Sequence, residues 1–387
     1  MRRDVQLLSD SAFHGRGYVL DGSNLAASYL EQRFREVGLQ PVQGDYYQPF
    51  SLVANVYEQR SHLRVGRRQM REGYDFIADP WSGICEGRYR IQRFDSSHFQ
   101  RSDLPELRKG RVPVIDMRGI DSPDEVSQVH SFKLEVLKER PFIELHEKLT
   151  WSVGQRRYEQ CALHVDRKSF PKRARRLRLS VQPEMRTYEA RNVIGMLPGL
   201  RSDSCLLITA HYDHLGRMGE ALFAGASDNA SGTATMLDLA TYFAQIKPPM
   251  DMYFIAFAGE EAGLAGSKYF VENPMVPLEK MRFLVNIDLM GSASKGIAIV
   301  NGTLYPDEVG RIGAINREGE LMPKIRLRGK AANSDHYWFA EAGVPAIFIY
   351  TEGNVSAYHD VHDLPEGLDW ARYEELFTLL RKFIQSF

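Results

Sequence analysis

The sequence predicts an α/β protein in which a mixed, largely parallel central sheet is sandwiched by helices and carries an inserted, small β-rich domain. Strand-like and helical patterns alternate from about residue 185 to the end of the sequence, as they do in sheets of this kind. The strand-like runs there are apolar at nearly every position, which is typical of strands covered on both faces. With 387 residues, the chain is long enough for this arrangement.

Residues 1–50 are predicted to form a helical part of the main domain. In the stretch DGSNLAASYLEQRFREVGLQP, the residues Leu25, Tyr29, Leu30 and Phe34 recur at helical spacing. Gly38 follows them, and glycine commonly ends a helix. We therefore expect an amphipathic helix here.

Residues 51–184 have a different pattern and are predicted to be the inserted β-rich domain. Short alternating stretches such as SHLRVG, GRYRIQRF and GRVPVIDMRG are typical of a small β-rich module. The run RKSFPKRARRLR at 167–178 contains no acidic residue. Such a run usually forms a solvated face, and docking of a phosphate or of a partner is the alternative.

Residues 185–387 are predicted to complete the main domain. We expect strands in NVIGMLPG, CLLITAHYDH, MYFIAFAG, MRFLVNIDLMG and VPAIFIYTEG, and helices in ASGTATMLDLATYFAQI and ARYEELFTLLRKFI. Ligands of such sheets bind at the carboxyl ends of the strands. The residues that follow each strand are therefore the candidates for a functional site.

Composition argues against several classes of partner. The formal net charge is −1, whereas binding to nucleic acid or to an acidic membrane depends on clustered positive charge. No apolar run approaches the ~20 residues needed to span a bilayer. The first stretch, MRRDVQLLSDSAFHGRG, lacks the apolar region of a signal peptide, so we expect none, and a signal already removed is the alternative.

The three cysteines, Cys85, Cys161 and Cys205, are far apart and odd in number. We therefore expect neither a disulfide framework nor a thiolate metal cluster. Cys205 begins the apolar segment CLLITA and is expected to be a small buried apolar residue.

Histidines and carboxylates gather where the expected strands end. Five separate segments supply them to what should be one edge of one sheet. These residues are His211, Asp213 and His214; Asp228; Glu260 and Glu261; Asp288; and Tyr358, His359, Asp360 and His362.

Taken singly, these residues have simpler interpretations, since Asp228 suits an amino-terminal helix cap and adjacent glutamates are usually exposed. Their joint position after successive strands predicts a metal site instead. Two imidazoles with three carboxylates and no thiolate suit zinc, or cobalt or manganese in its place. Two dications would balance three carboxylates and one bridging hydroxide, so we expect two ions.

Six motifs, in this order, resemble those of the co-catalytic di-zinc aminopeptidase family: TAHYDHLG, GASDNASG, FAGEEAGLAGS, NIDLMG, NSDHYWFAEAGVPA and YHDVHDLPEGLD. The resemblance covers residues 188–387 and continues weakly into the first 50. The stretch KGRVPVIDMRG loosely resembles part of a protease-associated insertion. The family has a mixed sheet sandwiched by helices, which is the fold expected above.

The resemblance implies a set of five metal ligands. His211 and Asp288 would bind one zinc ion, and Glu261 and His359 would bind the other. Asp228 would bridge the two ions.

The same resemblance implies roles for residues around the metals. Glu260 matches the general base, and Tyr358 matches the tyrosine that helps to hold the oxyanion. Asp213 matches the carboxylate that orients a metal-bound imidazole, as ligating histidines usually require. Asp335 and His336 lie in a family-like motif and are expected to support the site. No ligand role follows for two further histidines, His214 and His362, which we expect to be structural.

The expected function is zinc-dependent hydrolysis of the peptide bond next to a free amino terminus. One alternative is a glutaminyl cyclase with a single zinc, and another is a catalytically inactive relative that serves as a receptor. A carboxypeptidase of related fold is conceivable, but no arginine cluster for a substrate carboxylate is evident. The resemblance suggests a secreted or periplasmic protein; the sequence leaves its oligomeric state and side-chain preference open.

Overall fold

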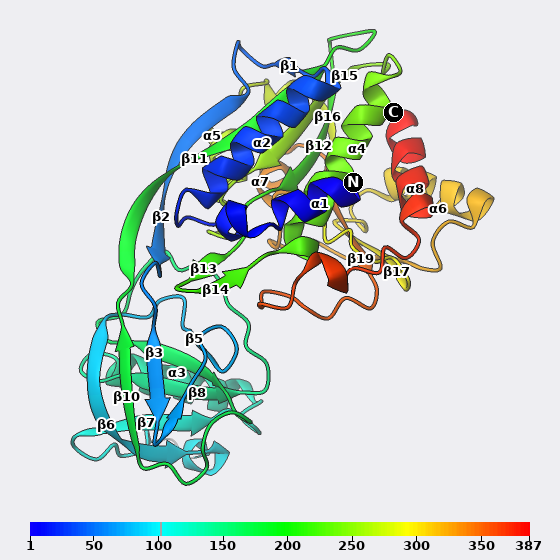
Figure 1. The fold of residues 1–387 in the computed structure, drawn as a ribbon. Coiled ribbons are helices and arrows are strands. Elements are labelled where there is room, and N and C mark those ends of the chain that lie inside the picture. The colour runs from blue at the N-terminus through cyan, green and yellow to red at the C-terminus, as the bar shows by residue number, and fades with distance from the viewer. Residues whose placement is uncertain (101–102) are drawn as a thin grey trace.

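The structure is a computed structural model that describes residues 1–100 and 103–387. Two large sheets dominate it (Figure 1). The larger sheet, with helices packed on it, makes up the upper part of the view, and the smaller sheet forms a separate lobe below. The fold is the mixed α/β arrangement that the sequence predicts.

The larger sheet contains nine strands within the described residues. In sheet order these are β1 (Gln40–Pro41), β11 (Glu184–Leu197), β15 (Asp251–Phe257), β12 (Cys205–His211), β16 (Met281–Asp288), β19 (Ala346–Glu352), β17 (Gly296–Val300) and β18 (Ile325–Leu327), with β2 (Tyr47–Val56) paired to β11. The central strands β15, β12, β16 and β19 are mutually parallel. β11 and β17 run antiparallel to the two ends of this set. The strands and helices expected in residues 185–387 are confirmed.

Helices cover both faces of the larger sheet (Figure 1). Buried side chains of one cluster come from α1 (Arg2–Leu8), α2 (Gly22–Val37), α4 (Gly232–Ala244), α6 (Pro306–Gly319) and α8 (Tyr373–Gln385). A second cluster contains side chains of α5 (Ala265–Glu272) and α7 (His336–Glu341). The central strands are therefore buried on both sides, which explains why their sequences are apolar throughout.

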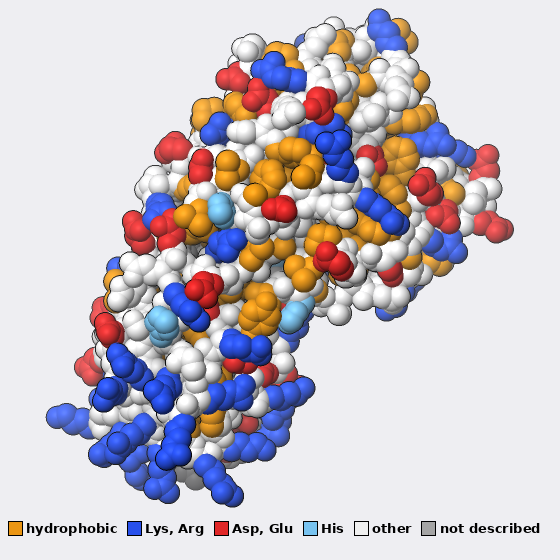
Figure 2. Space-filling model, in the orientation of Figure 1, with side chains coloured by type: hydrophobic (Ala, Val, Ile, Leu, Met, Phe, Trp, Pro, Cys, Tyr) orange, Lys and Arg blue, Asp and Glu red, His pale blue; other side chains and the backbone are white. Residues whose placement is uncertain are grey.

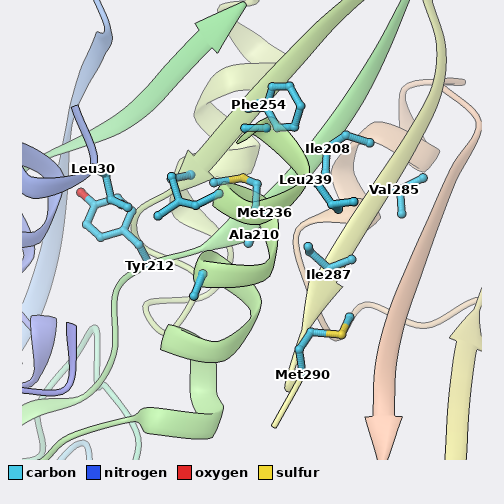
Figure 3. Close-up of a cluster of buried hydrophobic side chains, with 14 of the residues drawn as sticks. Leu30, Ile208, Ala210, Tyr212, Met236, Leu239, Phe254, Val285, Ile287 and Met290 are labelled. Atoms are coloured by element: carbon cyan, nitrogen blue, oxygen red, sulfur yellow. The ribbon is translucent and has the colours of Figure 1, made fainter. Parts of the chain in front are cut away.

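Strand β12 shows how one strand supplies both cores. Leu206, Ile208 and Ala210 point into the first cluster, whereas Cys205 and Leu207 point into the second. This alternation is the two-residue period of a strand. Figure 3 shows Ile208 and Ala210 beside Met236 and Leu239 of α4 and near residues of β16. Cys205 is buried as a small apolar residue, as expected.

Helix α2 confirms the amphipathic helix expected near the amino terminus. Leu30 and Phe34 are fully buried in the core. Leu25, however, is 41 % exposed, so its inclusion in the apolar face was wrong. The packed face of α2 contains the small residues Ala26 and Ala27 instead, which allow close approach of the helix to its neighbours.

The smaller sheet lies in the chain between β2 and β11, and we call residues 62–181 the inserted segment. In sheet order its strands are β4 (Arg68–Gln69), β3 (His62–Val65), β10 (Arg176–Val181), β6 (Cys85–Phe94), β7 (Arg111–Asp116), β8 (Phe142–His146), β9 (Ala162–Asp166) and β5 (Phe76–Ala78). Helix α3 (Pro123–Val136) follows β7. Strand β2 belongs to the larger sheet and extends to Val56, past the boundary drawn at residue 51.

The inserted segment packs against the main sheet's loops. Its core also contains Met218 and Phe223, from the hairpin of β13 (Gly216–Met218) and β14 (Ala221–Phe223). Val361, from the loop after β19, belongs to the same core. The inserted segment is thus joined to the edge at which the parallel strands end.

Cys85 and Cys161 form a disulfide within the inserted segment, with Cα atoms 5.6 Å apart. The expectation that the cysteines form no disulfide was wrong. The two residues are 76 positions apart in the sequence, and only the fold brings Cys85, at the start of β6, close to Cys161, just before β9. Closing so long a loop restricts the unfolded chain and stabilises the folded one.

A buried charge cluster joins α3 to the smaller sheet, formed by Asp79, Lys133, Glu144 and His164. Nζ of Lys133 lies 2.7 Å from Asp79 and 3.2 Å from Glu144. Nε2 of His164 lies 3.0 Å from Glu144 and 3.3 Å from Asp79. Burial alone would lower the pKa of His164, but the two carboxylates raise it to about 9. Two cations thus balance two carboxylates.

None of the helices in the described ranges has the length and apolar character required to span a bilayer.

Candidate metal centre

The carboxyl ends of the parallel strands bring the candidate residues together. His211 is the last residue of β12, and Asp288 is the last residue of β16. Glu260 lies shortly after β15, and His359 lies in the loop that follows β19. Because these strands are parallel, their carboxyl ends meet at one edge of the sheet.

Asp228 lies at the centre of the group. Its Oδ1 is 3.4 Å from Nε2 of His211, and its Oδ2 is 3.0 Å from Nε2 of His359. His211 Nε2 is also 3.3 Å from Asp288, and His359 Nε2 is also 3.3 Å from Glu261. The two oxygens of one carboxylate thus face two separate pairs of side chains, which is the arrangement of a carboxylate that bridges two cations.

The local backbone aims Asp228 at this centre. It lies at a kink in the segment Ala226–Ser231, where its own backbone is not helical (φ −110°, ψ 99°), and its peptide bond to Asn229 is cis. Asn229, rather than Asp228, accepts a hydrogen bond from the backbone of Gly232 at the start of α4. Asp363 accepts hydrogen bonds from the backbone N–H groups of Ser227 and Asp228. The interpretation of Asp228 as a helix cap therefore does not hold.

The donor set fits two dications. Within the described residues, His211, Asp228 and Asp288 place ligand-type atoms within 4.8 Å of one another, and Asp228 and Glu261 do so with His214. Oδ1 of Asp288 has no hydrogen-bond partner among these residues although it is buried. A buried carboxylate requires positive charge or hydrogen bonds nearby. Imidazole and carboxylate donors are those that zinc accepts.

His214 lies nearer to the centre than its sequence motif indicated. Its Nδ1 is 2.9 Å from Oε1 of Glu261, while the other oxygen of Glu261 faces His359. His214 therefore orients Glu261 and leaves the second carboxylate oxygen available to a cation.

The carboxylate of Asp213 holds the backbone of the two adjacent glutamates in place. Its carboxylate accepts hydrogen bonds from the backbone N–H groups of Glu260, at 3.2 Å, and Glu261, at 3.3 Å. The hydroxyl of Tyr18 donates to the same carboxylate at 2.5 Å. Nδ1 of His211 is 3.2 Å from the backbone carbonyl of Asp213 but 3.8 Å from its carboxylate. The main chain of Asp213 is therefore better placed than its side chain to orient His211.

Glu260 differs from Glu261 in surroundings. Burial raises the pKa of Glu260 well above its ordinary value; His211 opposes this rise, and the negative charge of Glu261 adds to it. Glu260 lines a cavity that opens onto the centre and is described below, whereas Glu261 points toward His214 and His359. Positive charge bound beside Glu261 would offset part of the rise. The adjacent glutamates are thus placed for different tasks.

A cavity of about 200 Å³ opens onto the centre. Its polar wall carries carboxylates, and none of its described lining residues is a lysine or an arginine. The remaining wall is apolar and aromatic. The lining consists of His211, Asp228, Glu260, Asp288, Leu289, Asn333, Phe348, Tyr350, Tyr358 and His359.

Tyr358 lies at the mouth of this cavity and is 45 % exposed. Its ring stacks on that of His359, with centroids 4.0 Å apart. Partial burial and the nearby carboxylates raise the pKa of Tyr358. The hydroxyl therefore keeps its proton and can donate a hydrogen bond.

Asp335 and His336 are fully buried at the start of α7, and neither belongs to the described lining of the cavity. The ring of His336 lies against that of Phe348, which does line it. Burial raises the pKa of Asp335 to about 7. His362 is exposed, and its ring approaches Tyr74 of the inserted segment.

Trp151 of the inserted segment holds His359 from outside the main sheet. Its backbone carbonyl lies 2.9 Å from Nδ1 of His359, and its N–H donates to the carbonyl of His359 at 2.9 Å. Histidines that bind metals commonly donate their second ring nitrogen in this way. The Trp151 ring packs against Tyr57 and Phe223. No sequence pattern indicates this contact, because the main chain makes it.

Arg16 is a further residue that the sequence did not indicate. It is fully buried, and burial lowers its pKa to about 10. Its guanidinium donates only to backbone carbonyls, several of which belong to the segment that leads to Asp228. The acceptors are Leu8, Tyr212, Ala224 and Gly225, each at 2.7 Å, and Asp228 at 3.4 Å.

A mixed sheet between helices thus carries imidazoles and carboxylates at its strand ends, with one aspartate facing both groups, and this defines a protein with a candidate dinuclear metal centre. Comparison with known proteins gives the family. Residues 192–384 match the model of Peptidase family M28. These residues form a domain of this family.

Curated relatives are similar over part of their length. Aminopeptidase YwaD of Bacillus subtilis (strain 168) is 30 % identical over 205 residues, which are 49 % of this chain and 43 % of YwaD. Leupeptin-inactivating enzyme 1 of Streptomyces exfoliatus is 31 % identical over 166 residues, which are 41 % of this chain and 35 % of that protein. The chain therefore matches less than half of the length of these two relatives.

The fold as a whole also occurs in solved structures. The zinc aminopeptidase BSAP of Bacillus subtilis aligns with 100 % of this chain and 93 % of its own, with a TM-score of 0.73 at 18 % identity. The alignment includes the inserted segment, so the two-sheet arrangement is shared.

Proposed function

We propose that the protein is a zinc-dependent aminopeptidase that removes the amino-terminal residue of peptides. The acidic lining of the cavity is the observation that carries this proposal. Glu260, Asp228 and Asp288 line it, and none of its described lining residues is a lysine or an arginine. Since the proposed zinc ions balance Asp228 and Asp288, Glu260 is the lining carboxylate left to attract the positive charge of a free amino terminus, and the described lining offers no cation to bind a terminal carboxylate.

The size of the cavity supports removal of single residues. At about 200 Å³ it is smaller than the ~300–1,000 Å³ of most ligand pockets. Phe348, Tyr350 and Leu289 supply an apolar wall for one side chain. A peptide therefore enters with its terminal residue, while the following residues stay outside.

In this proposal His211 and Asp288 would hold one zinc ion, Glu261 and His359 would hold the other, and Asp228 would contribute to both. Bound zinc supplies Lewis acidity and a water whose pKa is lowered to ~7. Asp213 and Trp151 fix the positions of the ligands around them.

In the reaction itself, Glu260 would transfer the proton and Tyr358 would stabilise the developing charge. Glu260 accepts a proton from the attacking water at a carboxylate oxygen, and the remaining hydroxide forms a bond to the scissile carbonyl carbon. The Tyr358 hydroxyl donates a hydrogen bond to the oxyanion that results. When the C–N bond breaks, Glu260 returns its proton to the leaving amine.

The variant Glu260→Gln tests this assignment, because it keeps the shape of the side chain but cannot accept the proton. We expect kcat for a leucyl-nitroanilide to fall ~10²–10⁴-fold, while elemental analysis still finds two zinc ions per chain. Glu279→Gln, a matched change at an exposed glutamate, should leave kcat unchanged. Full turnover by Glu260→Gln in a metal-defined preparation would refute the assignment.

The products formed from substrates with free and with blocked amino termini distinguish an aminopeptidase from the alternative reactions. A free amino terminus should be required, so acetylated leucyl-nitroanilide should not be hydrolysed. A glutaminyl-naphthylamide should release the free amine together with glutamine. Pyroglutamate as the main product, or turnover of acetylated substrates only, would contradict the proposal.

We also propose that the protein works in an oxidising compartment outside the cytoplasm. The disulfide between Cys85 and Cys161 supports this, because disulfides persist mainly in such compartments. Mass spectrometry of the protein from its native source, alkylated before and after reduction, tests it: two free thiols at these positions would contradict the proposal.

A further inference from the structure

The positive charge of the chain is concentrated in the inserted segment. Residues 62–181 contain 25 Lys and Arg against 17 Asp and Glu, although the whole chain has 49 and 50. Figure 2 shows lysines and arginines gathered over the lower end of the lobe, away from the main sheet. The near-zero net charge of the chain therefore conceals a strongly basic surface.

Five arginines lie on one exposed face of the smaller sheet, and we call them the arginine face. Arg178 of β10 lies directly opposite Arg64 of β3 on one side and Arg88 of β6 on the other. Arg176 of β10 lies opposite Arg90 of β6. Residues directly opposite or two apart in a sheet share a face. All five are exposed.

This arrangement is unfavourable for the isolated chain, because like charges placed opposite each other on neighbouring strands destabilise a sheet. None of the five guanidinium groups has an ion-pair or hydrogen-bond partner within residues 1–100 and 103–387. Along β6, the nearest carboxylate on this face is Glu86, opposite Ser180 and two residues from Arg88. An anion bound across the rows would relieve the repulsion.

The arginines surround a groove of about 610 Å³. Gly66 and Gly110 leave the lining open where they lie, since an added Cβ atom at Gly66 would meet only Ala174, at 3.8 Å, and one at Gly110 would meet nothing within 4 Å. Arginines two apart on a strand are ~7 Å apart, and neighbouring strands are ~4.8 Å apart. The groove thus presents a two-dimensional grid of guanidinium groups, each able to bind an oxyanion through two hydrogen bonds.

We propose that the arginine face binds an acidic polysaccharide, a linear polymer with repeated carboxylate or sulfate groups. The repeated spacing of the guanidinium groups matches a polymer better than a single small anion. Cys85 of the disulfide is the first residue of β6, the strand that carries Arg88 and Arg90. Disulfides persist mainly in oxidising compartments such as the extracellular space, and this is where extracellular acidic polysaccharides occur.

Other polyanions fit the face less well. Proteins that bind single-stranded nucleic acid combine positive charge with aromatic side chains on which bases stack, and Tyr89 is the one aromatic residue among the described residues that line the groove. Insertion into a lipid surface requires exposed apolar side chains, and Leu177, the apolar lining residue, is buried. An acidic peptide cannot add as a strand, because the backbone beneath the groove is already paired.

The experiment compares the full-length protein with the double variant Arg88→Gln/Arg178→Gln. The probes are fluorescein-labelled dextran sulfate and polygalacturonate, with uncharged dextran as the control ligand. We expect both acidic polymers to bind, with affinity that falls as salt is raised. Loss of two charge-assisted contacts should weaken the Kd ~10–100-fold.

A matched variant separates the groove from net charge. Arg201→Gln/Arg282→Gln removes two exposed arginines of the main sheet's surface and should leave the Kd within about twofold of the original. Removing opposed charges in the groove variant should not lower its unfolding temperature, and its aminopeptidase activity should be unchanged. These readouts exclude a folding defect as the cause of lost binding.

Two results would overturn the proposal. One is equal binding of the acidic polymers by the groove variant. The other is that the protein binds an oligothymidylate or phosphatidylserine vesicles more tightly than either polymer, and that Arg88→Gln/Arg178→Gln abolishes this binding. That result would assign the face to nucleic acid or to a membrane instead.

Discussion

Arg16 supports the candidate metal centre through the backbone, and Arg16→Met tests this. The change keeps much of the side chain's volume but removes every donor of a fully buried guanidinium. Four carbonyl groups then lose bonds of 2.7 Å, and one loses a bond of 3.4 Å. Among the described residues, the carbonyl of Gly225 keeps a second donor, the N–H of Ala230 at 3.2 Å, and the other three short bonds have no replacement.

The size of the effect follows from two opposing contributions. Each of the four short bonds contributes ~1–2 kcal/mol, since a buried carbonyl left without a donor is unfavourable. Burial lowers the pKa of Arg16 from 12.5 to about 10, so removing the buried cation relieves a penalty of ~3 kcal/mol. The net loss in the free energy of unfolding should be about 1–5 kcal/mol.

Urea unfolding of the metal-free protein measures this loss directly, and zinc titration measures its effect on the centre. Because the lost bonds hold the segment that leads to Asp228, zinc affinity should fall ~10–100-fold. The control Arg35→Met removes an exposed helical pair with Glu31 and should change stability by less than ~0.5 kcal/mol. If Arg16→Met is as stable as Arg35→Met, the argument from the buried carbonyls is wrong.

Three further predictions concern the inserted segment. Trp151→Pro removes the N–H that donates to His359 and should weaken zinc binding ~10–100-fold relative to Trp151→Ala, which keeps the main-chain contact, as isothermal titration would show. Cys85→Ser should lower the free energy of unfolding by ~3–4 kcal/mol, measured by urea titration against the oxidised parent, and an unchanged midpoint would show that the disulfide does not restrict the unfolded chain. The pKa of His164 is raised to about 9 in the folded protein, so its stabilising contribution is complete below pH ~6.5 and is lost as pH rises through ~9. Urea midpoints at pH 6 and pH 9.5 should therefore differ less for His164→Gln than for the parent.

The sequence indicated much of the candidate centre because each ligand-type residue follows an apolar strand. His211, Glu260 and Asp288 are separated widely in the chain, but parallel strands place their carboxyl ends at one edge. The strand pattern was strong because both faces of these strands are buried. Local pattern and global fold therefore agreed in this part of the chain.

The contacts that hold the ligands were not visible in the sequence, because they use the main chain. Trp151 meets His359 through backbone groups, and every acceptor of Arg16 is a carbonyl. Any residue type has such groups, so no pattern of side chains reveals them. The disulfide was missed for a related reason: an odd number of distant cysteines was taken as evidence against pairing, whereas Cys205 is buried alone and leaves a pair.

The contact between Trp151 and His359 sets an order for building the proposed centre during synthesis of the chain. The residues of the first group, His211, Asp228 and Asp288, have all been synthesised once residue 288 is added to the growing chain. The second group forms only after His359, close to the carboxyl terminus, has been synthesised. It also requires a folded inserted segment, because the backbone carbonyl of Trp151 contacts the ring of His359. A growing chain therefore holds the residues of only half of the proposed centre until its last part has been made, so the proposed activity would begin only after most of the chain has been synthesised.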